Sequence, residues 1–184
     1  MKKLVLVSVF CSLVAGPALA QMQPAPAAKP AAPANPMVAG TMMAYGMAKG
    51  NLTKAADQMP ESLYAFKATP DVRSFGQIVG HVADANYMIC AAAAGEKPPV
   101  GDVEKTKTAK ADLSKALGES FAYCDKIFAS MTDAEGAKMV PFFGNQQAKL
   151  SVLAFNAAHD MEHYGNIVTY MRLNKMVPPS SQGR

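Results

Sequence analysis

Tryptophan is absent from this chain of 184 residues, and histidine and cysteine are scarce, with three of each. Long apolar runs are also lacking, because nothing in the sequence approaches the roughly 20 apolar residues of a transmembrane helix. Charge of one sign is not in large excess either, since 18 Lys and Arg residues face 14 Asp and Glu residues. No basic stripe with interleaved aromatic residues accompanies that small surplus. We therefore expect neither stable membrane insertion nor a nucleic-acid partner.

The first 20 residues carry the three parts of a secretory signal peptide. Lys2 and Lys3 form the charged start, residues 4–14 form the apolar core, and Ala18-Leu19-Ala20 forms a small-x-small cleavage site. Residues 21–37 follow as a tether rich in proline and alanine, in which the prolines disfavour an α-helix. We expect an exported protein, periplasmic or secreted, whose folded domain spans residues 38–181.

Apolar residues at helical spacing dominate the rest of the chain. They predict long helices over residues 38–58, 109–131 and 147–173, and another that starts after Ser74 and ends at Gly95. Ser74 and Gln77 have the spacing of a capping box. Residues 132–146 read as a connector with a short extended piece. Met42, Met43 and Met47 are expected to fill gaps in the core rather than to form a soft-metal cluster. Four long helices predict an all-α four-helix bundle.

The histidines have the spacing of a metal site. His159 and His163 stand one turn apart on one face of the last helix, so both imidazoles reach one ion. His81 lies on the apolar face of the second helix. If these faces pack together, three neutral nitrogens converge and leave coordination positions open, as a catalytic zinc-type site requires. Asp84 and Glu162, and also Asp160, are placed to orient a ligand imidazole. The alternative is a set of buried histidines hydrogen-bonded to backbone.

The segment HDMEH at 159–163 also matches the inverted zinc-protease signature His-x-x-Glu-His, in which Glu162 would be the general base. A small bundle has no substrate cleft built on strands, which disfavours a protease. No Gly-x-Ser-x-Gly turn supports a Ser/His/Asp triad.

Cys90 and Cys124 remain after removal of the signal peptide. An even count in an oxidising compartment favours a disulfide between them. It would close a loop of about 35 residues and add roughly 3–4 kcal/mol to the free energy of unfolding. Two buried, inert thiols, or one reactive thiol, are the alternatives.

Several segments together resemble the DinB/YfiT-like superfamily: YAFKATPDVRSF at 64–75, GHVADANY at 80–87, HDMEHYG at 159–165 and MVPPS at 176–180. The likeness covers residues 40–181. It implies a four-helix bundle, often a homodimer, that holds a divalent ion, commonly zinc or nickel, through three histidines. Matched position by position, these are His81, His159 and His163. Relatives include bacillithiol S-transferases and a mycothiol-dependent isomerase, in which the metal lowers the pKa of a thiol and holds the thiolate as nucleophile.

The sequence thus predicts an exported, metal-dependent thiol transferase or hydrolase acting on a small-molecule substrate. A signal peptide departs from the cytosolic relatives and makes a cytosolic thiol cosubstrate less suitable. One rival is a non-catalytic metal-binding or stress-response module. Another is a partner-binding bundle whose histidines are structural.

Overall fold

The structure of the protein is a computed structural model, which describes residues 33–183. The predicted signal peptide and residues 21–32 of the predicted tether lie outside the described residues. Within residues 33–183, no helix is both long enough and apolar enough to cross a membrane.

Four long helices form the bundle: α1 (Pro36–Gln58), α2 (Phe75–Ala94), α4 (Lys110–Ser130) and α6 (Lys149–Leu173). This arrangement confirms the predicted four-helix bundle. Shorter elements fill the connections: η1 (Glu61–Leu63), α3 (Val103–Thr106), α5 (Asp133–Gly136), β1 (Met139–Phe142), β2 (Asn145–Ala148) and η2 (Pro179–Ser181).

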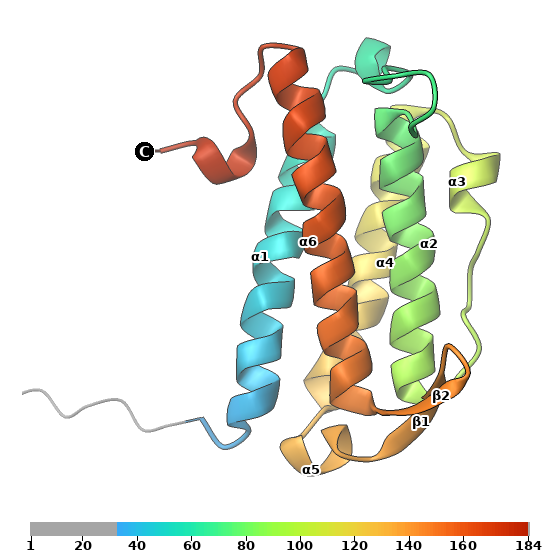
Figure 1. Cartoon of the computed structure of the whole chain (residues 1–184), viewed down its shortest axis with the longest axis vertical. Helices are drawn as coiled ribbons and strands as arrows, with labels where there is room; N and C mark the ends of the chain where they lie inside the picture. The colour runs from blue at the N-terminus through green and yellow to red at the C-terminus, as the bar shows by residue number, and fades with distance from the viewer. Residues whose placement is uncertain (1–32, 184) are drawn as a thin grey trace, which may run out of the picture. The chain divides into compact units, whose positions relative to one another are not determined.

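Each long helix packs on two others: α2 lies between α4 and α6, and α1 also contacts both α4 and α6. Figure 1 shows that α1 and α6 run in one direction and that α2 and α4 run in the opposite one. Because α2 and α4 are parallel, the chain between them must return along the whole length of the bundle. The short helix α3 lies on this return and packs against α2 (Figure 1).

The predicted ends of α2 are confirmed. The Ser74 side chain accepts the backbone N–H of Gln77 at 3.2 Å, and the Gln77 side chain accepts that of Ser74 at 2.8 Å. Gly95 closes the helix in the left-handed region with φ of 80°. Helix α1 begins at Pro36, two residues inside the predicted tether. Proline is tolerated in the first turn because an N–H there has no intrahelical acceptor.

The connector before α6 contains more regular structure than the sequence predicted. It holds α5, and β1 and β2 form an antiparallel hairpin in which Phe142 pairs with Asn145. Phe143 and Gly144 make the two-residue turn, with φ of 47° and 77°. Positive φ at both positions matches the twist of a tight hairpin. As β2 runs to Ala148, α6 starts at Lys149 rather than at residue 147.

The buried core runs through all four long helices. Its largest fully buried side chains are Leu52, Met59, Phe75, Ile89, Leu113, Leu117, Phe121, Phe128, Leu153, Ile167 and Met171. The expectation that Met42, Met43 and Met47 fill the core was wrong, because these side chains are 44%, 68% and 55% exposed. Helix α1 turns its Val38, Tyr45 and Leu52 face inward, so the methionines face outward.

Cys90 of α2 is bonded to Cys124 of α4, with 5.5 Å between their Cα atoms. Both positions lie toward the C-terminal ends of these parallel helices, and both are fully buried. The bond therefore fixes the register of two helices that are joined by a long connection.

Candidate metal centre

The packing of α2 on α6 brings the three predicted histidines together. The Nε2 atom of His159 lies 3.3 Å from Nε2 of His81 and 3.1 Å from Nε2 of His163. One nitrogen from each residue falls within 4.8 Å of the others, a grouping that suits a metal ion. His163 is buried, and His81 and His159 are half-buried. The centre thus lies at the edge of the core, between protein interior and solvent.

These distances fit a shared ion better than a hydrogen-bonded triad. Two imidazole nitrogens that bind one zinc ion tetrahedrally, each about 2.1 Å from it, lie about 3.4 Å apart. A hydrogen bond between neutral imidazoles instead needs an N–H on one ring and a lone pair on the other. His159 Nε2 lies near two other Nε2 atoms. Because it carries either an N–H or a lone pair, it forms a good hydrogen bond with only one of them. A divalent cation would accept all three lone pairs at once.

Burial keeps the α6 histidines neutral, which is the form that binds metal. Burial, and then the neighbouring His159 and His81, lower the pKa of His163 to about 4. Burial and then His81 lower the pKa of His159 as well. Both imidazoles therefore offer free lone pairs at neutral pH.

The Nδ1 atoms of the three rings have different surroundings. His81 Nδ1 lies 3.2 Å from the carboxylate oxygen Oε2 of Glu104, the partner that commonly orients a metal-binding histidine. The Asn166 amide nitrogen lies 3.5 Å from His163 Nδ1. Rotation of that amide group by 180° would place its oxygen to accept a hydrogen bond from the ring N–H. Among residues 33–183, no partner is found for the buried Nδ1 atom of His159.

Glu104 is a site residue that the sequence reasoning missed. It lies on α3, and its other carboxylate oxygen accepts a hydrogen bond from Nε of Arg73 at 2.8 Å. A Cβ atom on Gly80 would lie 2.8 Å from the Cα of Glu104, so only glycine lets α3 approach α2 this closely. Nothing in the spacing of the sequence places a residue of the long return connection beside His81.

The predicted orienting residue Asp84 contacts this network indirectly. Its carboxylate accepts the backbone N–H groups of Val103 and Glu104, both at 2.9 Å. Asp84 thereby fixes the first turn of α3, and α3 in turn presents Glu104 to His81.

The other two acidic candidates form no hydrogen bond with an imidazole among residues 33–183, where the ring nitrogens contact Glu104, Asn166 and one another. Glu162 is exposed on α6. Asp160 is fully buried in the bundle, where its Oδ2 accepts a hydrogen bond from the Asn156 amide at 3.3 Å. Burial raises the pKa of Asp160 well above its usual value. The role predicted for Glu162 rests on the sequence pattern alone, and Asp160 belongs to the polar interior.

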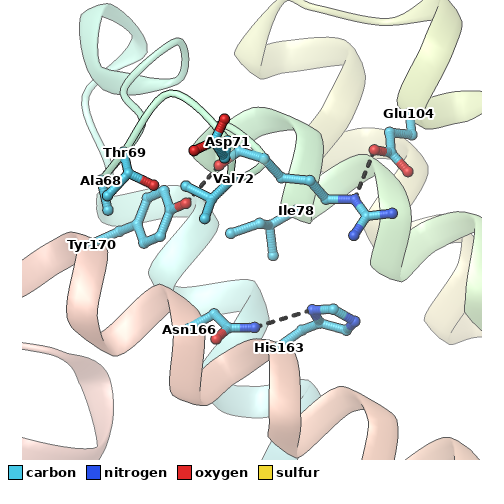
Figure 2. Close-up of a pocket in the computed structure, with 10 residues that line it drawn as sticks. Ala68, Thr69, Asp71, Val72, Ile78, Glu104, His163, Asn166 and Tyr170 are labelled. Atoms are coloured by element: carbon cyan, nitrogen blue, oxygen red, sulfur yellow. Dashed lines mark hydrogen bonds and ion pairs between the residues drawn. The ribbon is translucent and has the colours of Figure 1, made fainter.

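Two pockets reach the histidine cluster. A polar one, about 580 Å³ in volume, is lined by His163, Asn166 and Tyr170 of α6, by Glu104, and by the segment before α2 that contains Arg73. Figure 2 shows His163 and Asn166 side by side on one wall and Glu104 across the pocket from them. The Tyr170 hydroxyl donates to the carbonyl oxygen of Arg73 at 2.6 Å and so anchors this segment. A second pocket, lined in part by His81 and His159, is mostly apolar.

Comparison with known proteins gives a family and a fold. The sequence model of the DinB superfamily matches residues 44–167, which include all three histidines. Among curated proteins, none matches the chain significantly.

Three solved structures illustrate the likeness in fold. A DinB-like protein from Bacillus cereus is 15% identical with a TM-score of 0.68, over 77% of this chain and 95% of that one. A DinB-like protein from Bacillus subtilis is 17% identical with a TM-score of 0.63, over 79% of this chain and 99% of that one. A conserved protein from Enterococcus faecalis is 15% identical with a TM-score of 0.61, over 74% and 95%. At such identities the likeness establishes the bundle and no activity.

Proposed function

The chain belongs to the DinB superfamily, and we propose that it is a metalloenzyme in which His81, His159 and His163 hold one divalent ion. Zinc and nickel are the proposed metals, because imidazole nitrogen is a favourable ligand for both. The proposed reaction is transfer of a group to a thiol or hydrolysis of a small electrophile. The observation that carries this proposal is the convergence of three imidazoles, with Nε2 of His159 3.3 Å from that of His81 and 3.1 Å from that of His163.

A three-histidine site suits catalysis because it leaves coordination positions open for a substrate or for water. The ion would act as a Lewis acid and would lower the pKa of a thiol or water that binds to it. Glu104 would hold the proton on His81 Nδ1, so that Nε2 keeps its lone pair for the metal. Arg73 lines the polar pocket beside His163, and its Nε is bound to Glu104, so only its other guanidinium N–H groups are left to bind a carboxylate or another anionic group of a substrate there.

We also propose that the protein works outside the cytoplasm as a homodimer, as the signal-like N-terminus and the family resemblance suggest. Export favours a thiol or an electrophile of that compartment as substrate. The disulfide between two buried cysteines is consistent with an oxidising compartment.

The metal content of the purified protein tests this proposal. Protein produced without a polyhistidine tag is expected to contain about one zinc or nickel ion per chain, since three neutral imidazoles converge. The measurement is elemental analysis of the purified protein. The matched variant is His81→Ala/His163→Ala, which removes ligands from both helices and is checked for folding by circular dichroism.

A folded double variant without metal supports the site. Fewer than about 0.1 ion per chain in the wild type, even after zinc and nickel are offered, contradicts the metalloenzyme proposal. If metal binds but no thiol transfer or hydrolysis is detected across a substrate panel, the protein is the non-catalytic metal-binding module instead.

A further inference from the structure

The apolar pocket beside the histidine cluster has no role in the function proposed above. It is about 410 Å³ in volume and opens between α2, α6, the segment after α2 and the turn of the hairpin. Its apolar lining consists mainly of Met88, Ile89, Pro98, Val100, Phe143 and Phe155. Its polar lining includes two of the three histidines, His81 and His159. The volume lies within the usual range of small-molecule sites.

Large apolar side chains from four separate segments remain open to solvent at this place. Met88 is 41% exposed, Val100 44%, Phe143 65% and Phe155 42%. Single exposed apolar residues are ordinary, but a contiguous group around a pocket marks a binding surface. These four side chains therefore form a surface that an apolar ligand would cover.

The hairpin carries aromatic rings toward the histidines. The ring centroid of Phe155 lies 5.8 Å from that of Phe143, 5.4 Å from that of Phe142 and 6.4 Å from that of His159. Phe143 has φ of 47°, a left-handed conformation that is costly for a bulky residue. Its side chain is largely exposed, so burial does not offset that cost in the free protein. A ligand that covers this ring would bury apolar surface that the free protein leaves open.

The charges around the pocket indicate that the part of a ligand that enters it is uncharged. Among residues 33–183, no Lys or Arg lines this pocket. Its one carboxylate, that of Asp84, already accepts two backbone N–H groups. The cation Arg73 lines the separate polar pocket. An anionic or cationic group would therefore lose its hydration here without gaining a partner of opposite charge.

We propose that this pocket binds the uncharged, apolar part of the substrate, an aromatic ring or an alkyl chain. The same molecule would present a donor atom, such as a thiol sulfur, to the metal held by the histidines. This second statement rests on the function proposed above, whereas the pocket's preference for an apolar ligand does not. Phe155 is the central specificity residue, because it contacts both the aromatic hairpin and the ring of His159.

The pocket is tested first in metal-free protein with the neutral fluorescent probe N-phenyl-1-naphthylamine. The wild type is expected to bind one probe molecule per chain, and Phe155→Ser to bind it about tenfold more weakly, because burial of an aromatic ring is lost. Val100→Ser, in a segment without helix or strand, is expected to weaken binding in the same direction. Met43→Ser is the control, since Met43 is 68% exposed on α1 and lines none of the pockets described here. Equal affinity of wild type and Phe155→Ser overturns the proposal.

The link to the metal is tested with cobalt(II)-loaded protein and two thiols. Phenylmethanethiol and 2-mercaptoethanol both offer a sulfur donor, but only the former has an aromatic ring. Absorption from the sulfur–cobalt contact is expected to show about tenfold tighter binding of phenylmethanethiol to the wild type. Phe155→Ser should remove this preference and leave 2-mercaptoethanol unaffected.

The two arms distinguish failure of the pocket from failure of the metal site. Equal affinity of the wild type for both thiols overturns the proposed link between pocket and metal. If no cobalt binds, the metalloenzyme proposal fails together with this link. The naphthylamine titration then still decides whether the apolar pocket binds an uncharged aromatic ligand.

Discussion

At the scale of single residues, Glu104 has a contact with the candidate metal centre that the sequence did not predict. Its carboxylate joins Arg73 to His81, with contacts of 2.8 Å and 3.2 Å. A carboxylate that accepts the Nδ1 proton of a histidine fixes the ring and raises the basicity of its Nε2 atom. Glu104 is thus a positioning residue for the proposed ligand His81.

We expect Glu104→Gln to weaken metal affinity by about 10- to 100-fold, because the amide is a poorer acceptor for the His81 ring proton. Competition with a chromophoric chelator measures this affinity directly. Glu119→Gln is the matched control, since Glu119 is exposed on α4, which carries none of the three histidines. An equal loss in both variants would indicate that general negative charge acts here, rather than the Glu104–His81 contact.

At the scale of elements, the disulfide links α2 and α4, two neighbouring helices that are otherwise joined only by a long connection. These parallel neighbours are separated by a connection that must run the length of the bundle (Figure 1). Linking Cys90 to Cys124, 34 residues apart, restricts the unfolded chain in this region. The bond also holds the parallel helices in register close to their ends.

We expect the Cys90→Ser/Cys124→Ser variant to lose about 3–4 kcal/mol of free energy of unfolding, because the unfolded chain regains its freedom. Urea unfolding of the metal-free protein measures the difference. Wild type treated with a reductant serves as a second route to the same state. If the reduced wild type stays as stable as the oxidised one, the bond does not contribute in this way.

At the scale of the whole molecule, the proposed metal links two helices that are far apart in sequence. His81 comes from α2, whereas His159 and His163 come from α6, the last long helix. The unfolded chain does not present these three residues together. A metal ion therefore binds the folded state in preference and stabilises the bundle as a unit.

Addition of zinc to metal-free protein is expected to raise the melting temperature. At a free zinc concentration of about 100 times the dissociation constant, the gain is about 2.7 kcal/mol. Differential scanning calorimetry at several zinc concentrations measures it. The His81→Ala/His163→Ala variant should show no such rise. A similar rise in that variant would point to zinc binding elsewhere on the chain.

Local patterns in the sequence were sufficient for the long helices and for several of their ends. The Ser74–Gln77 capping box and the Gly95 C-cap form within a few residues, so sequence spacing predicts them. The hairpin was harder to predict, because residues 139–148 show no clear alternation and the strands depend on pairing with each other. The outward methionines of α1 were misassigned because helical spacing does not say which face a neighbour covers.

The sequence by itself determined the helical bundle and two ligands of the candidate centre, since the four-residue spacing of His159 and His163 places both on one helix face. Tertiary structure decided the rest. The packing of α2 on α6 brought His81 to that pair, and the close approach of α3 at Gly80 brought Glu104 behind His81. The hairpin brought Phe143 next to Phe155 and so completed the apolar pocket. These contacts join residues 12 to 78 positions apart, and such separations leave no periodic signal in the chain.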